Sequence, residues 1–402
     1  MTQSQAFVGL DPQASPVTGG RAARLSCARL TLTDFRNYDS VRLEPGAGPV
    51  VLTGANGAGK TNILEALSFL VPGSGLRRAR LHDVARRTPG EPDKAWAVAA
   101  TIEGGEIAVD LGTGLESAGA SKRVVHVDGE AKRALAVLGE TFATHWLTPQ
   151  MDRLFLDGSQ ERRRFLDRLV FAFDPAHAGR ITGYTHAQRE RAKLLSENKI
   201  DDAWLSALED TMATRGAAVA AARLGVAERL AAAAQKTDGI FPAAVLAIDG
   251  LAEQWLTACP ALEVEDRLRA TLRRTRSSDA QSNGAGTGHS GRLPHQSDLL
   301  VTHAAKSMPA GQCSTGEQKM LLVGLVLAAA RMSVQDEGRV PVLLLDEVAA
   351  HLDAAHREAL FSEVRSLGCQ AWFTGTDADL FTPLLGTAKF YTVDAGRVQE
   401  TD

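Results

Sequence analysis

The sequence is poor in cysteine and has no excess of positive charge. Its 402 residues carry a formal net charge of −4, so the chain as a whole lacks the basic character typical of nucleic-acid-binding proteins. Any such binding has to come from local basic clusters. Four widely spaced cysteines form no Cys-x-x-Cys pair, which argues against a zinc ribbon or hook and predicts a reducing, cytoplasmic location. They are Cys27, Cys259, Cys313 and Cys369.

Long hydrophobic runs are also missing. The longest, residues 320–330, is shorter than the roughly 20 residues that a bilayer span requires. The first 20 residues are polar and contain no apolar core of a signal peptide, so we expect no membrane association. Residues 1–23 are rich in Gln, Ser, Pro and Gly and predict a flexible tail.

The clearest motif is a phosphate-binding loop of the form Gly-x-x-x-x-Gly-Lys-Thr. It follows the apolar run 50–53 and precedes apolar residues at helical spacing that end at Pro72 and Gly73. Its glycines let backbone N–H groups turn toward an anion, and the helix start adds a favourable dipole. The lysine reaches the outer phosphates and the threonine hydroxyl ligates Mg²⁺. The predicted triphosphate site consists of Gly54, Ala55, Asn56, Gly57, Ala58, Gly59, Lys60 and Thr61.

A second motif lies far along the chain, where an apolar run from Val342 ends in Asp346 and Glu347. An acid at the carboxyl end of a buried parallel strand lies beside the phosphates, so Asp346 is the candidate magnesium ligand. Glu347 is then placed to orient or deprotonate the attacking water. We assign catalysis to Glu347 with Lys60, and metal binding to Thr61 and Asp346.

A third motif opens a strongly apolar helix near residue 314. Ser314 and Glu317 have the spacing of an ordinary capping box. The same serine hydroxyl, the N–H of Gly316 and the helix start would equally form a second phosphate receptor. One nucleotide and two receptors predict a head-to-tail pair of chains with ATP between them. Asp353 precedes a further helix, either as a plain N-cap or as part of this interface.

The overall pattern predicts an α/β fold that is split by an insert. We expect a core of residues 24–159 and 293–402, with a phosphate-loop sheet and an antiparallel β-subdomain. Residues 160–292 are rich in Ala, Leu, Arg and Glu and predict an inserted all-helical lobe, ending in a flexible loop at 277–291. Expected strands are residues 25–32, 41–43, 50–53, 96–102, 106–111, 123–127, 299–301, 340–345, 371–374, 390–393 and 397–398, with a buried helix over 320–331.

These motifs, in this order, resemble the ABC-type ATPases of the branch that holds structural-maintenance-of-chromosomes and Rad50 heads. Within that branch the chain resembles the RecF family of bacterial recombination and gap-repair proteins. The matching segments are residues 32–38, 54–61, 147–149, 162–167, 294–295, 314–319 and 345–347.

The resemblance implies an ATPase head that dimerises with ATP, hydrolyses it slowly and binds double-stranded and gapped DNA together with RecO and RecR. It adds Arg36, Asn37, Ser314, Gly316, Glu317 and Asp353 as nucleotide-binding residues. It also adds Gln150 as a catalytic and metal-contacting residue, at a position where the family often has an acid. Two other departures are Ala350, where the family has serine, and the lack of a histidine after Phe373, where Thr374 or Thr376 stands instead.

Local basic clusters are the candidate DNA contacts, although such clusters are equally often solvated helix faces. We single out Arg77, Arg78, Arg80, Arg162, Arg163 and Arg164. Two other functions remain open from the residues alone, namely a transporter nucleotide-binding subunit and a short DNA tether. Against the first, the interval from Lys60 to Ser314 is much longer than a transporter subunit has. Against the second, the chain lacks both long heptad repeats and a Cys-x-x-Cys apex.

Overall fold

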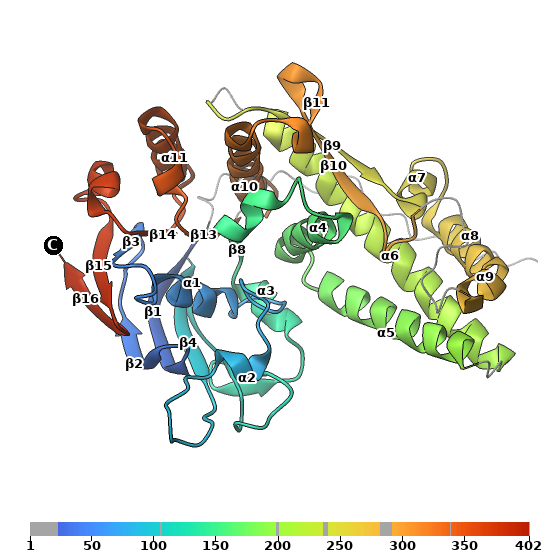
Figure 1. Ribbon diagram of the computed structural model, residues 1–402, viewed down its shortest axis with the longest axis horizontal. Coiled ribbons are helices and arrows are strands. Elements are labelled where there is room, and N and C mark those ends of the chain that lie inside the picture. The colour runs from blue at the N-terminus through green and yellow to red at the C-terminus, as the bar shows by residue number, and fades with distance from the viewer. Residues whose placement is uncertain are drawn as a thin grey trace, which may run out of the picture.

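The computed structural model describes residues 23–104, 107–197, 201–235, 240–281, 292–337 and 339–401. A broad α/β head carries the N-terminal and C-terminal thirds of the chain, and an elongated insert extends from one side of it (Figure 1). Among the described helices, none combines the length and the apolar character needed to cross a membrane.

The centre of the head is a six-stranded sheet in the order β16-β15-β3-β14-β13-β8, parallel except for β16. Alternate residues of these strands face two different cores. Val51 and Phe373 belong to one, whereas Leu52 and Trp372 belong to the other. Burial on both faces explains the uninterrupted apolar runs in the sequence. The strands are β3 (Val50–Thr53), β8 (Thr144–Leu147), β13 (Val342–Leu345), β14 (Ala371–Gly375), β15 (Lys389–Asp394) and β16 (Arg397–Thr401).

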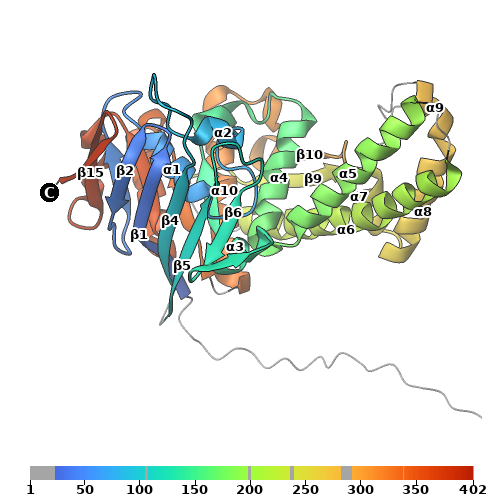
Figure 2. The same cartoon turned by 90° about the horizontal axis from the view of Figure 1, so that it is seen from below.

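A second, mainly antiparallel sheet forms the β-subdomain, with the order β12-β1-β4-β5-β6-β7 and β2 paired to β1. Figure 2 shows β2, β1, β4 and β5 side by side on one face of the head. The strands are β1 (Ala23–Phe35), β2 (Tyr38–Leu43), β4 (Ala97–Gly104), β5 (Ile107–Gly114), β6 (Val124–Val127), β7 (Glu130–Lys132) and β12 (Arg339–Val340).

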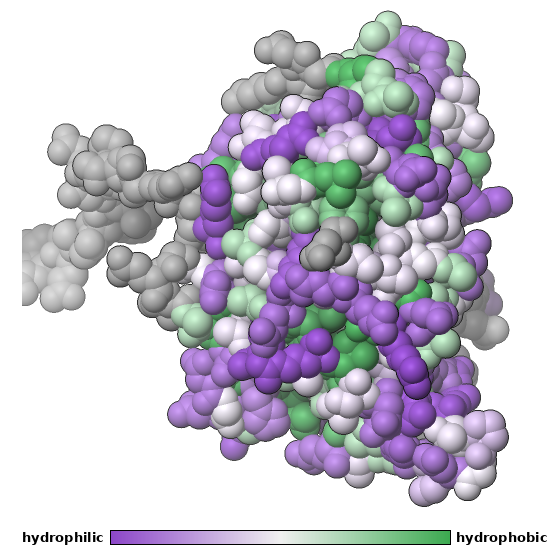
Figure 3. Space-filling view, turned by 90° about the vertical axis from the view of Figure 1, so that its left-hand side faces the viewer, coloured by the Kyte–Doolittle hydropathy of each residue, from purple (hydrophilic) through white to green (hydrophobic). Residues whose placement is uncertain are grey.

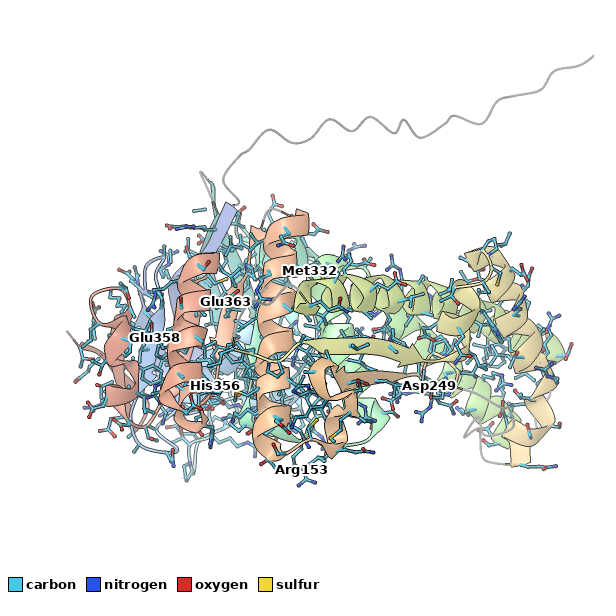
Figure 4. The ribbon with its side chains drawn as sticks, turned by 90° about the horizontal axis from the view of Figure 1, so that it is seen from above. Arg153, Asp249, Met332, His356, Glu358 and Glu363 are labelled. Atoms are coloured by element: carbon cyan, nitrogen blue, oxygen red, sulfur yellow. The ribbon has the colours of Figure 1, made fainter. Side chains whose placement is uncertain are left out.

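Helices cover both faces of the central sheet. Helix α1 (Lys60–Ser68) shares a core with β1 and β4, while α10 (Thr315–Glu337) and α11 (Ala354–Leu367) cover the other face. Figure 4 shows α11 beside α10, with Glu363 of α11 placed to accept a hydrogen bond from Arg331 Nε. Shorter helices are α2 (Leu81–Val84) and α3 (Ala136–Thr141), and the 3₁₀ segments are η1 (Pro149–Arg153), η2 (Ala304–Lys306), η3 (Ala310–Gln312), η4 (Ala349–His351) and η5 (Ala378–Leu384).

The insert is mostly helical but not all-helical, which corrects one detail of the sequence prediction. Strand β9 (Ala244–Asp249) pairs with β10 (Asp298–His303) along six residues, and β11 (Met308–Pro309) joins β10. Residues 277–281 of the expected loop belong to helix α9, and positions 282–291 lie outside the described residues. The other helices are α4 (Ser159–Phe173), α5 (His177–Ser196), α6 (Asp202–Gln235), α7 (Leu251–Leu256), α8 (Ala261–Arg274) and α9 (Arg276–Gln281).

Two main cores divide the insert, and a small third cluster of Leu194, Leu195 and Leu205 lies between α5 and the start of α6. Buried residues of α4 and of the C-terminal half of α6 pack with α10 in the core of the head, whereas α5, the first half of α6, α7 and α8 form a core of their own. A buried ion pair links the two parts, because Arg223 of α6 donates two hydrogen bonds to Asp167 of α4 at 2.7 and 2.8 Å. The long helix α6 therefore connects the far end of the insert to the head.

Candidate functional site

The phosphate-binding loop runs from the end of β3 to the first turn of α1, as the sequence predicts. Two of its glycines have no room for a side chain. A Cβ on Gly54 (φ 145°) would lie 2.1 Å from the Val393 carbonyl oxygen, and one on Gly59 (φ 123°) would lie 2.6 Å from the Tyr38 hydroxyl oxygen. Only glycine satisfies both the positive φ and the close approach at these positions.

Neighbouring side chains hold the loop from outside. The Asn37 side-chain amide donates to the Ala58 carbonyl oxygen at 2.8 Å, and the Tyr38 hydroxyl donates to the Gly59 carbonyl oxygen at 3.0 Å. Both residues lie at the turn between β1 and β2, so the β-subdomain shapes the loop.

Lys60 closes over the loop. Its Nζ donates to the carbonyl oxygens of Gly54 and Ala55 at 2.7 and 2.9 Å, and the residue is only 4% exposed. Burial lowers the pKa of Lys60, and the nearby carboxylates of Glu347 and Asp346 oppose that shift only in part. The ammonium group therefore lies inside the loop, where it can exchange carbonyl oxygens for phosphate oxygens.

Asp346 is the centre of a small hydrogen-bond network at the end of β13. Its Oδ1 accepts from the hydroxyls of Thr61 at 2.9 Å and Thr374 at 2.7 Å. The residue is 5% exposed, and burial raises the pKa of its carboxyl despite these two hydrogen bonds. The Thr61 hydroxyl and this carboxylate, from opposite ends of the sequence, thus meet at one point.

Glu347 follows in a strained conformation. Its φ of 54° lies in the left-handed region, which non-glycine residues seldom adopt, and its N–H donates to the Thr374 hydroxyl oxygen at 2.8 Å. Strain of this kind persists where surrounding structure holds it and is concentrated at functional sites. Thr374, one of the two residues at the expected switch position, therefore supports both acids. The family resemblance pointed to this position, where a histidine is expected after Phe373, and left Thr374 and Thr376 as alternatives.

Gln150 lies in η1, directly after β8. Because Leu147 of β8 is in register with Leu345 of β13, this segment leaves the sheet at the same edge as Asp346. An ion pair of 3.0 Å between Asp152 of η1 and Lys319 ties the segment to α10. Figure 4 places Arg153, also of η1, close to the N-terminal end of α10. The sequence motifs include Lys319 but contain no signal for its partner.

The second predicted receptor lies at the start of α10 and is open to solvent. Ser314, Thr315 and Gly316 are exposed. Glu317 forms the capping box, since its Oε2 accepts from both the Ser314 N–H and the Ser314 hydroxyl at 3.0 Å. An ion pair with Lys306 and these hydrogen bonds lower the pKa of Glu317 to about 2. The capping box accounts for the hydrogen bonds of the Ser314 and Glu317 side chains, and the solvent-facing side of the motif stays exposed.

Two predicted nucleotide contacts are engaged within the protein. The Arg36 guanidinium donates to the buried Glu65 carboxylate at 2.8 and 2.6 Å and to the Asp83 carbonyl oxygen at 2.8 Å, so it fastens the β1–β2 turn to α1. Asp353 caps α11 by accepting from the His356 N–H at 2.9 Å. Direct contact of either residue with nucleotide stays a prediction.

The candidate DNA contacts separate into two groups. Arg162 donates to Asp298 at 2.8 and 2.9 Å with a side chain only 16% exposed, and Arg163 donates to the Ser297 carbonyl oxygen at 2.8 Å. Both thus join α4 to β10. Arg77 donates to Asn62 at 2.6 Å and also faces Glu65. The other three are exposed: Arg78 and Arg164 share Glu161, and Arg80 has no ion pair among the described residues.

The donors at the sheet edge are oxygen atoms, which fit a hard cation such as magnesium. Within the described residues there is no cluster of three or more His, Cys, Asp or Glu side chains that could hold a metal by themselves. Mg²⁺ is usually bound through one or two carboxylates together with substrate phosphates, and Thr61 and Asp346 supply such a partial set.

Comparison with known proteins agrees with this geometry. The family model of the RecF/RecN/SMC N terminal domain matches residues 26–395. The DNA replication and repair protein RecF of Mesorhizobium japonicum is 46% identical over 383 residues, covering 94% of this chain and 99% of that protein. RecF of Caulobacter sp. (strain K31) is 48% identical over 383 residues, covering 92% of this chain and 95% of that protein.

Solved structures show the same fold. One described as the recombination mediator protein RecF-ATPrS in the RecFOR pathway superposes with a TM-score of 0.80 at 19% identity, covering 95% of this chain and all of that one. The Smc head domain of Pyrococcus furiosus, with an extended coiled coil, gives a TM-score of 0.51 at 14% identity, covering 94% of this chain and 96% of that one. The predicted ATPase-head fold is therefore confirmed. Together with the identities above, these findings show that the chain belongs to the RecF family of DNA replication and repair proteins.

Proposed function

We propose that this RecF-family protein is an ATP-dependent DNA-binding switch of recombinational gap repair. It binds ATP and Mg²⁺ as a monomer, dimerises head to tail around the nucleotide, and opens after slow hydrolysis. One observation carries the proposal: Thr61 and Asp346 converge at 2.9 Å beside the phosphate-binding loop, while the second receptor at Ser314 is exposed. A complete site then needs the second receptor from another copy.

The residues of the first receptor divide the chemistry between them. Backbone N–H groups of residues 54–61 and the Lys60 ammonium bind the phosphates, and the Thr61 hydroxyl with Asp346 would hold Mg²⁺. Bound Mg²⁺ would offset the charge of the phosphate oxygens during hydrolysis. Glu347 accepts the proton of the attacking water, and Thr374 keeps Asp346 and Glu347 in place.

The Ser314 receptor completes the site from the partner copy. The outward face of Ser314 and the N–H of Gly316 would bind the partner's outer phosphate. Gln150 contacts the metal and the water from η1, and Asp353 and Arg36 complete the nucleotide contacts suggested by family resemblance. The family resemblance implies slow hydrolysis, and because the dimer encloses the nucleotide, hydrolysis would govern its release.

DNA is the proposed macromolecular ligand, with preference for double-stranded DNA beside single-strand gaps. The exposed arginines Arg78, Arg80 and Arg164 are the first candidates for backbone phosphate contacts, since Arg162 and Arg163 are already engaged with β10. RecR and RecO are proposed partners because of the family resemblance. The transporter and tether alternatives are set aside, since relatives match over 95% or more of their own length.

Filter binding with duplex, single-stranded and gapped DNA, each with and without ATP, tests the proposal. We expect tight binding only with ATP, strongest on gapped duplex, and loss of the ATP effect in Lys60→Ala. Equal binding with and without ATP would contradict the switch.

A further inference from the structure

A cavity of about 330 Å³ lies beside the nucleotide edge, between the segment after α1, the β8–η1 segment and α4. Its walls are aromatic at depth, with Trp146, Phe165 and Phe171, and polar at the nucleotide side, with Thr148 and Gln150. The volume lies at the lower end of the range typical of small-molecule sites. We call it the Arg168 cavity after the cation in its wall.

Arg168 is unusual because its charge is not compensated. The guanidinium stacks over Trp146 at 4.4 Å and near Phe165 at 5.2 Å from the ring centroids. Its hydrogen bonds reach only the Trp146 carbonyl oxygen at 3.3 Å and the Met151 sulfur, which is a weak acceptor. Within the described part of the chain no carboxylate pairs with Arg168, and its buried Nε has no hydrogen-bond partner.

Burial lowers the pKa of Arg168 to about 9, and repulsion from Arg78 acts in the same direction. Arg168 is half-buried, and its Nε is buried without a hydrogen-bond partner, so holding this cation without an anion lowers the stability of the folded protein. Retaining such a group is reasonable where a ligand supplies the missing negative charge.

Three acids line the cavity, and none of them pairs with Arg168; Asp157 pairs with Arg153 at 3.5 Å. Asp167 is occupied by Arg223 and His177, which lower its pKa to about 2 against the effect of burial. Glu161 is shared by Arg78 and Arg164 at the mouth. The cavity therefore has aromatic walls, a cation without a counter-ion, and a mouth where Arg78 and Arg164 share one carboxylate.

We propose that the Arg168 cavity binds a small organic anion, whose aromatic or apolar body packs against Trp146, Phe165 and Phe171 while its anionic group pairs with Arg168. This site is separate from the phosphate-binding loop and does not depend on the DNA-binding proposal. Thr148 and Gln150 form one wall of the cavity. A bound ligand would therefore restrict the movement of η1 and, through Gln150, influence the nucleotide site.

The test uses the full chain and two probes of similar shape. 8-Anilinonaphthalene-1-sulfonate carries the anion, and N-phenyl-1-naphthylamine is its neutral counterpart. We expect saturable binding of the anionic probe at one site per chain, about tenfold tighter than the neutral probe, as one charge-assisted hydrogen bond would give. Saturating ATP should leave the stoichiometry of the anionic probe at one molecule per chain.

Two variants and two controls locate the site. Arg168→Gln should abolish the preference for the anionic probe, and Ser74→Trp, at the exposed mouth, should weaken both probes. Ser74→Ala and Arg273→Gln, the latter on the exposed surface of α8, should bind as the parent does. If Arg168→Gln does not fold, Ser74→Trp decides alone. Unchanged binding in Ser74→Trp, no saturable binding, or one-for-one displacement by ATP would overturn the proposal.

Discussion

The two predicted phosphate receptors of this chain differ most in what surrounds them. The loop at residues 54–61 is held by Asn37, Tyr38 and Val393 from other segments, and its Lys60 is buried. The receptor at Ser314 is exposed, and its polar contacts come from its own capping box and the surface ion pair between Glu317 and Lys306. A surface pair of this kind contributes little to stability.

The difference indicates which receptor works alone. Under the proposed function, folding completes the first receptor, so we expect nucleotide affinity to be a property of one chain. We expect the second receptor to gain a ligand only when a partner copy brings one to its outward face, so a change there should affect association. Outside the receptors, the end of the head that carries β15 and β16 is largely hydrophilic, with small hydrophobic patches separated by polar side chains (Figure 3). Variants that separate nucleotide binding, hydrolysis and association therefore test the comparison.

The largest expected effect is on hydrolysis. Glu347→Gln keeps the shape of the side chain but cannot accept a proton, so single-turnover hydrolysis should slow by roughly 10²–10⁴-fold, typical of a lost general base. ATP binding and the dimer should survive, with longer residence on DNA. Asp346→Asn serves as the contrast, because it should weaken magnesium binding and dimerisation together. Hydrolysis at the parental rate in Glu347→Gln would place the base elsewhere, with Gln150 or Asp353 next in line.

Loss of the buried cation tests the first receptor. Lys60→Ala removes the ammonium group aimed at the outer phosphates, and we expect ATP affinity to fall by about 10²-fold, corresponding to roughly 3 kcal/mol for a charge-assisted contact. Equilibrium dialysis measures the change. Lys306→Ala, which removes a lysine beside the second receptor, is the matched control and should bind ATP as the parent does. Parental affinity in Lys60→Ala would show that the loop is not the site.

The second receptor should affect association alone. Ser314→Arg projects bulk and charge toward the partner copy, so ATP should no longer produce a dimer, while ATP affinity stays within about twofold of the parent. Sedimentation with and without ATP gives the answer. Ser117→Arg, in the exposed loop between β5 and β6, controls for an added surface charge. A Ser314→Arg variant that still dimerises with ATP would contradict the head-to-tail arrangement.

The smallest effect separates exposed from engaged arginines. If Arg80 contacts a DNA phosphate, Arg80→Gln should reduce the slope of log affinity against log salt by up to about one unit. Arg162→Gln should leave that slope unchanged and instead lower the melting temperature, because Asp298 loses its partner inside the protein. Equal slopes for Arg80→Gln and the parent would mean that Arg80 is a solvated surface residue and contacts no DNA phosphate.

Much of the fold was predictable because its signals are local. The apolar run 50–53 with the glycine pattern after it, and the run ending in Asp346 and Glu347, each predict a strand and its exit. The pairing of strand β9 was not predictable from the sequence, because β9 is short and its partner β10 follows 49 positions later. A short strand depends on its partner for stability, and the partner is invisible in a local window.

The sequence by itself determined the phosphate-binding loop, since the Gly-x-x-x-x-Gly-Lys-Thr pattern between an apolar run and a helix start is contained in one short segment. It also determined the position of Asp346 and Glu347, because acids that directly follow a buried apolar strand lie at the edge of the sheet. Only the tertiary structure decided which charges are free. Arg162 and Arg168 lie six positions apart on α4 in one basic segment, yet the first is paired with Asp298 and the second has no counter-ion among the described residues. The reason is physical: the state of a charge depends on the groups packed opposite it, and those come from distant parts of the chain.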